Sequence, residues 1–207
     1  MRRFGTAIAI AIVLLALISG GLVIYMSIEK AQALRAGEKH LLVQAEDVAS
    51  FGEVRVLTPE STIEKGGLRD YGLLNGWVEG RVTDLVVIMP GGKNGVLVNS
   101  AFYKFPSASA AQAALDALPD PIEHCSWKSL VKGASLLDES LVDLLSGHSW
   151  RIWQGIDDEG VPAYVLWIQF GSYVSEVHIN AAQGQEAFAR QLLNHITAQL
   201  VSGVEQE

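Results

Sequence analysis

Cysteine is almost absent from this chain of 207 residues, and its histidines show no metal-binding spacing. The single Cys125 excludes an internal disulfide, and an isolated cysteine is more often a small buried hydrophobic residue than a catalytic thiol. The five histidines include no His-x-x-x-His pair. The adjacent His124 and Cys125 would need partners from elsewhere in the chain to hold a metal ion. The sequence therefore gives no reason to expect a metal or another cofactor.

Basic residues are also scarce: the chain has 15 Lys and Arg against 23 Asp and Glu, a net charge of −8. The first 30 residues carry a net charge of +2, so the remainder carries −10. A domain this acidic is repelled by nucleic acid phosphates and by anionic lipid surfaces. We therefore expect no nucleic acid partner, and a domain that is held off the membrane or meets a basic partner.

Motifs of catalysis are missing as well. The chain has no Gly-x-Ser-x-Gly elbow, which excludes a hydrolase of that type. The Gly-rich segment 91–95 lacks the upstream glycine and the Ser or Thr after Lys93 that a phosphate-binding loop requires, so it is interpreted as a hairpin turn. The acidic run 157–159 lacks the alternating oxygen ligands of a calcium loop. We predict that the protein is not an enzyme.

One uncharged apolar segment, residues 5–28, organises the chain. As a helix it would be about 36 Å long, enough to cross the roughly 30 Å hydrocarbon core of a bilayer with some tilt. Arg2 and Arg3 before it favour a cytoplasmic N-terminus and export of the rest. Within the segment, Ser19, Gly20 and Gly21 would let another helix pack closely, although a lone helix also tolerates them.

The apolar segment predicts a single-pass protein of the bacterial cytoplasmic membrane. We divide the chain into an anchor at 1–30, a juxtamembrane linker at 31–43 and an extracytoplasmic domain at 44–203. A cleaved signal peptide is the alternative, since Ala31-Gln32-Ala33 resembles a cleavage site after Ala33. The uncharged segment is longer than the usual apolar region of a signal peptide, which favours an anchor that is retained.

Periodicity predicts the elements of the exported domain. In its first half we expect a short helix at 44–52, strands at 54–58 and 76–82, a hairpin of strands 84–90 and 96–105, and a helix at 107–118. In its second half we expect a helix at 137–145, strands at 148–154, 161–170 and 173–180, and a helix at 183–201. This order predicts an α+β fold, an antiparallel sheet with helices mainly on one face. The similar order of the two halves suggests a diverged two-half repeat.

The tryptophans are the best candidates for a contact surface. In a strand, Arg151 and Trp153 share one face while Trp150 and Ile152 share the other. Tryptophan and arginine are common anchors of protein interfaces, so Arg151, Trp153 and the isolated Trp127 are interface candidates. An ordinary second core layer also explains Trp153. Glu176 and His178 share a polar strand face and are expected to form a solvated pair.

The short helix at 45–48, the segment Tyr164 to Ile179 and the closing helix resemble small exported bacterial α/β sandwiches. These are the PsbP/Mog1-like lipoproteins and the extracellular sensor domains of actinobacterial serine/threonine kinases. The resemblance covers mainly residues 96–118 and 147–201. It implies a non-catalytic sensor, assembly factor or accessory subunit, and it supplies no site residues. The chain lacks both the lipobox cysteine of the lipoproteins and a kinase domain.

Two functions follow from these features. The first is a non-enzymatic accessory or scaffold subunit, or assembly factor, of a larger membrane complex with protein partners. The alternative is an extracytoplasmic sensor that binds a small apolar ligand between the sheet and its helices. A closely packed core beneath the last helix would count against the alternative.

Overall fold

The computed structural model describes residues 38–66, 73–92, 94–119, 127, 129–156, 160–181 and 183–205. The predicted anchor at 5–28, with Ser19, Gly20 and Gly21, lies outside these residues, as do the cleavage site after Ala33 and Cys125. No helix within the described ranges is long and apolar enough to cross a membrane. The compact unit that carries the fold runs from His40 to Glu207.

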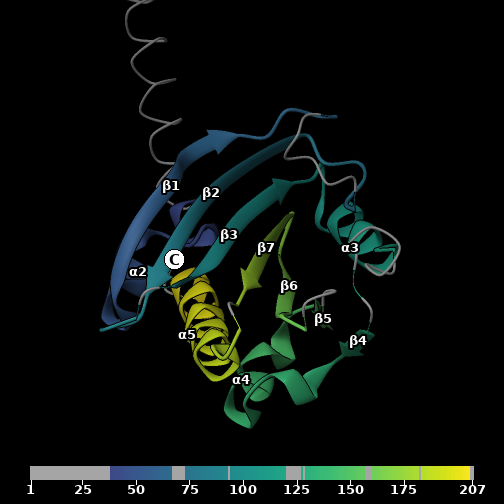
Figure 1. Cartoon of the computed structure of the whole chain (residues 1–207). Helices are drawn as coiled ribbons and strands as arrows, with labels where there is room; N and C mark the ends of the chain where they lie inside the picture. The colour runs from purple at the N-terminus through teal and green to yellow at the C-terminus, as the bar shows by residue number, and fades with distance from the viewer. Residues whose placement is uncertain are drawn as a thin grey trace, which may run out of the picture. The chain divides into compact units, whose positions relative to one another are not determined.

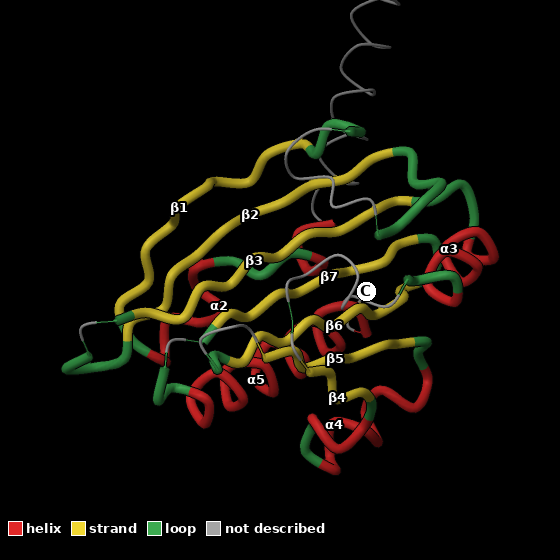
Figure 2. The backbone as a smooth tube through the Cα atoms, turned by 45° about the vertical axis from the view of Figure 1, so that its right-hand side comes forward, coloured by secondary structure: helices red, strands yellow, loops and turns green. Residues whose placement is uncertain are grey.

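Seven strands form one antiparallel sheet in the order β1-β2-β3-β7-β6-β5-β4 (Figure 2). The strands are β1 (Glu53–Thr62), β2 (Glu79–Ile88), β3 (Gly95–Lys104), β4 (Ser129–Lys132), β5 (Trp150–Ile156), β6 (Pro162–Phe170) and β7 (Tyr173–Asn180). The predicted α+β class with an antiparallel sheet is confirmed.

Helices cover both faces of this sheet. On one side, which we name the α5 face, the core includes α2 (Ala45–Val48), α4 (Glu139–Leu144) and α5 (Glu186–Glu205). On the other side, the α3 face, the core includes α3 (Ala108–Asp116). Short 3-10 helices complete the chain: η1 (Lys39–Leu41), η2 (Ala49–Phe51), η4 (Ala134–Leu136) and η5 (Leu145–Gly147). The prediction that the helices lie mainly on one face therefore holds except for α3.

The strand β6 is buried on both faces, as its continuous apolar sequence predicts. Leu166 and Ile168 point into the α5 face, whereas Val165 and Trp167 point into the α3 face, and all four are at most 1% exposed. The two hydrophobic cores are thus separated by the thickness of one sheet, and β6 belongs to both.

The helix α5 packs its apolar stripe on the sheet. Leu192, Ile196 and Leu200 are buried, as their spacing of four residues predicts. The helix does not stop at Gly203 but continues to Glu205. A Cβ atom at position 203 would lie 3.0 Å from the side chain of His40, so this glycine allows a close approach to the start of the domain.

Three strands differ from the prediction, the first being β1, which runs to Thr62 and is longer than the strand predicted at 54–58. The strands predicted at 76–82 and 84–90 are one continuous strand, β2, because the polar residues at its centre are bonded to neighbouring strands. The hydroxyl of Thr83 donates to the carbonyl of Thr58 at 3.0 Å, and Asn99 donates to the carboxylate of Asp84. The short strand β4 was not predicted at all, since three of its four residues are exposed and carry no apolar alternation.

The two halves of the domain match in their strands but not in their helices. Each contributes a three-stranded meander, β1-β2-β3 and β5-β6-β7, and the meanders meet where β3 pairs with β7. If a twofold axis related the two meanders, it would pass between the antiparallel strands β3 and β7 and stand perpendicular to the sheet. Equivalent helices of the two halves would then lie on the same face of the sheet. The closing helices α3 and α5 nevertheless lie on opposite faces, and Figure 1 shows α2 behind the strands. A repeat thus describes the strand order and not the whole domain.

The first residues of the compact unit are held on the α5 face by two buried serines. The hydroxyl of Ser100 on β3 accepts a hydrogen bond from the amide of Val43 at 3.0 Å. The hydroxyl of Ser175 on β7 donates to the carbonyl of Leu41 at 2.8 Å. Leu41, Leu42 and Val43 are at most 4% exposed, so this end of the expected linker is packed into the core.

We predict that Ser100→Ala lowers the free energy of unfolding by about 1–3 kcal/mol, because it leaves the buried amide of Val43 without an acceptor. The exposed Ser202 on α5 provides the control, and Ser202→Ala should change the stability by less than about 0.5 kcal/mol. Urea unfolding of the full chain in detergent measures both values. Equal stabilities of the two variants would show that the serine contact does not hold this segment.

Candidate functional site

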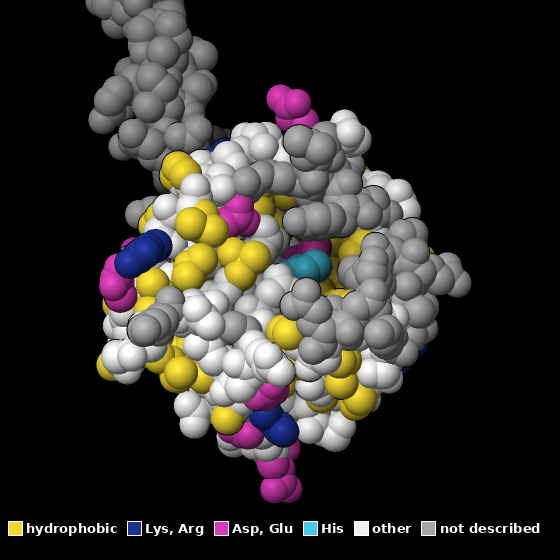
Figure 3. All heavy atoms as spheres, viewed as in Figure 1, with side chains coloured by type: hydrophobic (Ala, Val, Ile, Leu, Met, Phe, Trp, Pro, Cys, Tyr) yellow, Lys and Arg dark blue, Asp and Glu magenta, His cyan; other side chains and the backbone are white. Residues whose placement is uncertain are grey.

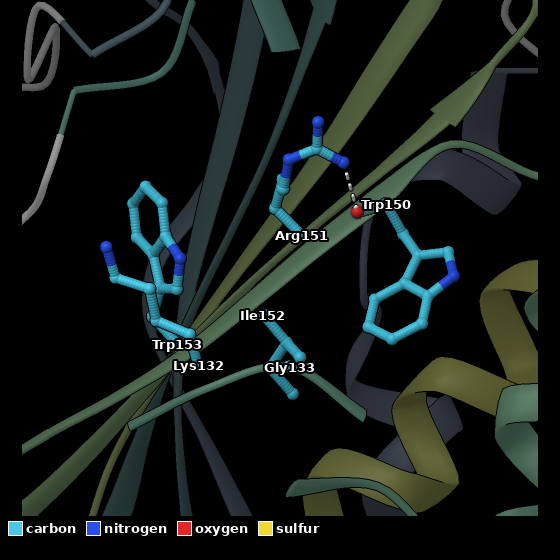
Figure 4. Close-up of a pocket in the computed structure, with 6 residues that line it drawn as sticks. All are labelled: Lys132, Gly133, Trp150, Arg151, Ile152 and Trp153. Atoms are coloured by element: carbon cyan, nitrogen blue, oxygen red, sulfur yellow. Dashed lines mark hydrogen bonds between the residues drawn. The ribbon is translucent and has the colours of Figure 1, made fainter. Parts of the chain in front are cut away.

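A groove of about 360 Å³ lies at the beginning of β5, beside the last residue of β4 (Figure 4). Its lining residues are Lys132, Gly133, Trp150, Arg151, Ile152 and Trp153. The groove thus contains two of the three interface candidates, Arg151 and Trp153. The third, Trp127, does not line it.

The groove exists because β4 is shorter than β5. The ladder between the two strands ends where Lys132 pairs with Trp153, and one further hydrogen bond joins the amide of Gly133 to the carbonyl of Ile152 at 3.1 Å. The edge of β5 at Trp150 therefore extends beyond β4. A strand edge that is not paired presents backbone donors and acceptors to other chains.

Arg151 occupies this part of the edge. Its Nη1 donates to the carbonyl of Trp150 at 2.9 Å, which Figure 4 shows as a dashed line. Its Nη2 forms an ion pair with Asp116 at the end of α3, at 2.8 Å. The Arg151 side chain is 43% exposed. The guanidinium is therefore oriented by two contacts while it remains accessible to a partner.

Trp153 belongs to the core of the α3 face. The residue is 6% exposed, and its ring lies edge-on to that of Trp167 at 4.6 Å between centroids. The ammonium of Lys132 lies over the Trp153 ring at 5.6 Å. The interpretation of Trp153 as a second core layer is confirmed, and only its rim contributes to the groove.

Trp150 is the half-buried indole of the groove. Figure 4 shows Trp150 and Trp153 on opposite sides of β5, as strand alternation requires. Trp150 packs against the edge of the α5-face core. Trp153 rather than Trp150 was the interface candidate on this strand, but Trp150 is the more accessible of the two.

Trp127 is held against β5. Its indole covers Gly155: a Cβ atom at position 155 would lie 1.8 Å from Cδ2 of Trp127. Trp127 is partly buried against the α3-face core together with Leu130. Four of the five tryptophans, Trp77, Trp127, Trp153 and Trp167, thus pack on the α3 face.

The pair of Glu176 and His178 is not solvated, contrary to the prediction. Nε2 of His178 is hydrogen-bonded to the carboxylate of Glu176. The side chain of Glu176 is only 2% exposed, and that of His178 is 16% exposed. The reason is the position of β7 in the middle of the sheet, where Glu176 is flanked by Ala101 on β3 and Trp167 on β6.

Two described residues have a clearly shifted pKa, and both lie outside the groove. Burial lowers the pKa of Arg81, but hydrogen bonds and ion pairs with Glu60 and Glu79 outweigh burial, so that its pKa is raised. Burial raises the pKa of the Tyr164 phenol, and Glu186 adds to this rise while Arg190 opposes it. Both groups therefore keep their protons at neutral pH.

The described residues contain no group of three or more His, Cys, Asp or Glu side chains that could hold a metal ion. His124 and Cys125, the adjacent pair of soft ligands, lie outside the residues that the structure describes. The groove presents cationic and aromatic side chains, and this combination suits recognition of another molecule.

Comparison with known proteins found similar structures only. No family model and no curated protein matches the chain. The extracellular domain of PknH from Mycobacterium tuberculosis gives a TM-score of 0.44 at 16% identity, covering 82% of this chain and 95% of that domain. A putative uncharacterized protein from Mycobacterium smegmatis, an Rv0999 ortholog, gives a TM-score of 0.40 at 14% identity, covering 78% of this chain and 95% of that one. The resemblance to PsbP/Mog1-like lipoproteins stays a prediction.

We predict that Gly155→Ala destabilises the domain by about 1–3 kcal/mol, because the added methyl group overlaps the Trp127 indole. Gly147→Ala is the matched control, since a Cβ atom there meets no atom within 4 Å. Thermal unfolding of the full chain measures both. In a chain that already carries Trp127→Ala, adding Gly155→Ala should lower the stability by less than it does in the parent chain. An equal effect of Gly155→Ala in both chains would contradict the contact.

Proposed function

We propose that the protein is a non-enzymatic accessory or scaffold subunit of a membrane complex. In this proposal residues 5–28 span the cytoplasmic membrane once, and the α+β domain lies on the extracytoplasmic side. The groove at the beginning of β5 is its docking site, and we name it the docking groove. The observation that carries the proposal is the combination of a strand edge, two cations and a half-buried tryptophan at one place.

The partner that this groove fits is an extended segment that carries carboxylates. Lys132 and Arg151 supply positive charge within a chain of net charge −8. The guanidinium fork of Arg151 suits a carboxylate, with which it can form two parallel hydrogen bonds. The half-buried indole of Trp150 adds apolar area that a bound segment would cover, and tryptophan is enriched in the energetic centres of interfaces.

The proposed anchor keeps the groove close to such a partner. Residues 29–39 separate the predicted span from the compact unit, which starts at His40. Eleven residues reach at most about 40 Å when fully extended. The serine contacts with Leu41 and Val43 fix where this tether enters the domain. Confinement near the membrane raises the effective concentration of the domain, so a weak interface can be occupied.

The alternative, a small apolar ligand between sheet and helix, gains no support at α5. Leu192, Leu193 and Ile196 are at most 1% exposed and lie in one cluster with Leu166, Val177 and Ile179 of the sheet. These side chains fill the space in which that ligand would bind.

Mild detergent extraction of native membranes, followed by native electrophoresis and mass spectrometry, tests the accessory role. We predict that the chain migrates with a stoichiometric set of integral membrane subunits. Migration alone or as a small homo-oligomer would contradict the proposal.

The variant Arg151→Ala tests the groove itself. We predict that it removes the chain from the complex while its free energy of unfolding changes by less than about 1 kcal/mol, because the ion pair with Asp116 is exposed. Arg55→Ala is the matched control, since Arg55 also forms an exposed ion pair, with Glu53, but lies on β1. Unchanged association of Arg151→Ala would show that the docking site lies elsewhere.

A further inference from the structure

A row of polar side chains crosses the α3 face next to its tryptophans. Register places Asp84 on β2 beside Asn99 on β3, and Asn99 beside His178 on β7. The next row toward α3 holds the buried carboxylate of Glu176, with Trp167 beside it. Two carboxylates, an amide and an imidazole therefore lie on three adjacent strands, β2, β3 and β7, beside the apolar residues of the α3 face.

This cluster contains two buried polar atoms that no described group satisfies. Asn99 is 9% exposed, and its Nδ2 donates to Asp84, whereas its Oδ1 has no hydrogen-bond partner. Trp167 is fully buried, and its Nε1 also has none. A buried polar atom without a partner costs free energy, and native structures contain few of them. Two such atoms in adjacent rows mark a place where a bound molecule would supply the missing contacts.

The surface is hollowed on this face. The view of Figure 1 looks onto the α3 face, with α2 behind the strands, and Figure 3 shows the same view. A histidine side chain is visible in a hollow there, next to an acidic one, and hydrophobic side chains gather over β1 and β2. Val86 and Leu97, which pair with each other in the next row beyond Asp84 and Asn99, are only partly buried.

We propose that this recess binds a small amine, a primary ammonium group on an apolar body. The unpaired oxygen of Asn99 requires a donor, and the carboxylates of Asp84 and Glu176 favour a positive charge. Aromatic rings attract cations as well, and Trp167, the strand neighbour of Glu176, belongs to the neighbouring wall. The ammonium of Lys132 lies over the next tryptophan, Trp153, and Arg151 lies beyond Trp167 at the end of its row.

The body of the ligand would lie on Val86 and Leu97, with its ammonium toward Asn99. The indole N–H of Trp167 would be met by an acceptor on a larger ligand of this class. The recess is separate from the docking groove on β5, so this inference does not rest on the proposed function.

Benzylamine, which is cationic at neutral pH, is the probe, and benzyl alcohol is its uncharged counterpart of nearly equal shape. The full chain in detergent micelles, labelled with ¹⁵N-tryptophan, gives one indole signal for each of its five tryptophans. Single Trp→Phe variants assign these signals. We expect benzylamine to shift the signals of Trp167 and Trp153 saturably, and to leave that of Trp150 on the α5 face unchanged.

Benzyl alcohol should bind at least about tenfold more weakly, the factor expected for one charge-assisted hydrogen bond. Equal shifts with both compounds, or no saturable shift with benzylamine, would overturn the proposal.

Two variants locate the site. Asn99→Leu removes the acceptor and Asp84→Asn removes a charge at nearly constant volume, and each should weaken benzylamine binding at least about tenfold. Asn194→Leu is the matched control, because Asn194 on α5 also has a buried Oδ1 without a partner. Its affinity should equal that of the parent chain. Full affinity in Asp84→Asn would overturn the proposed recess, even if Asn99→Leu fails to fold.

Discussion

The antiparallel pairing of β3 with β7 is the contact on which the rest of this domain depends. Its eight residue pairs run from Leu97 and Asn180 to Lys104 and Tyr173, and they join two meanders that are otherwise separate sheets of three and four strands. The same two strands provide polar side chains on both faces. On the α5 face, Ser100 and Ser175 hold the beginning of the domain. On the α3 face they place Asn99 beside His178. A shift of this register by one residue would exchange these faces, so the junction fixes both the packing and the sites.

The two faces have different roles because they are closed differently. On the α5 face, a long helix and the buried segment from Leu41 to Val43 cover an apolar surface completely enough to bury nearly every side chain. On the α3 face, the short helix α3 covers only one end of the strands, and tryptophans and polar side chains occupy the remainder. The docking groove lies at the beginning of β5, where its pairing with β4 stops. Within the described residues, both proposed sites therefore lie where neither a helix nor a paired strand covers the sheet.

Strong local signals made much of the fold predictable from the sequence. Ser107, at the start of the predicted helix 107–118, caps α3 by accepting a hydrogen bond from the amide of Ala110, and the doubly apolar β6 is a central strand. The sites were less predictable, because their character depends on neighbours that are distant in sequence. Nothing near Glu176 indicates burial, since Ala101 and Trp167 reach it only through strand pairing. Alternation placed Arg151 and Trp153 on one face correctly, but whether Trp153 is exposed depended on Trp167 of the next strand.

The central claim is that the docking groove at the beginning of β5 contacts a membrane subunit. Photo-crosslinking in native membranes tests this claim most directly. A photoreactive amino acid replaces Val131, which is exposed on β4 next to Lys132, so that Arg151 is kept. In a second chain it replaces Val56, which is exposed on the opposite edge strand β1. The account predicts one discrete adduct from position 131, in which mass spectrometry identifies an integral membrane protein with an acidic extracytoplasmic segment, and no such adduct from position 56. The absence of an adduct at 131, or identical products from both positions, would contradict the account.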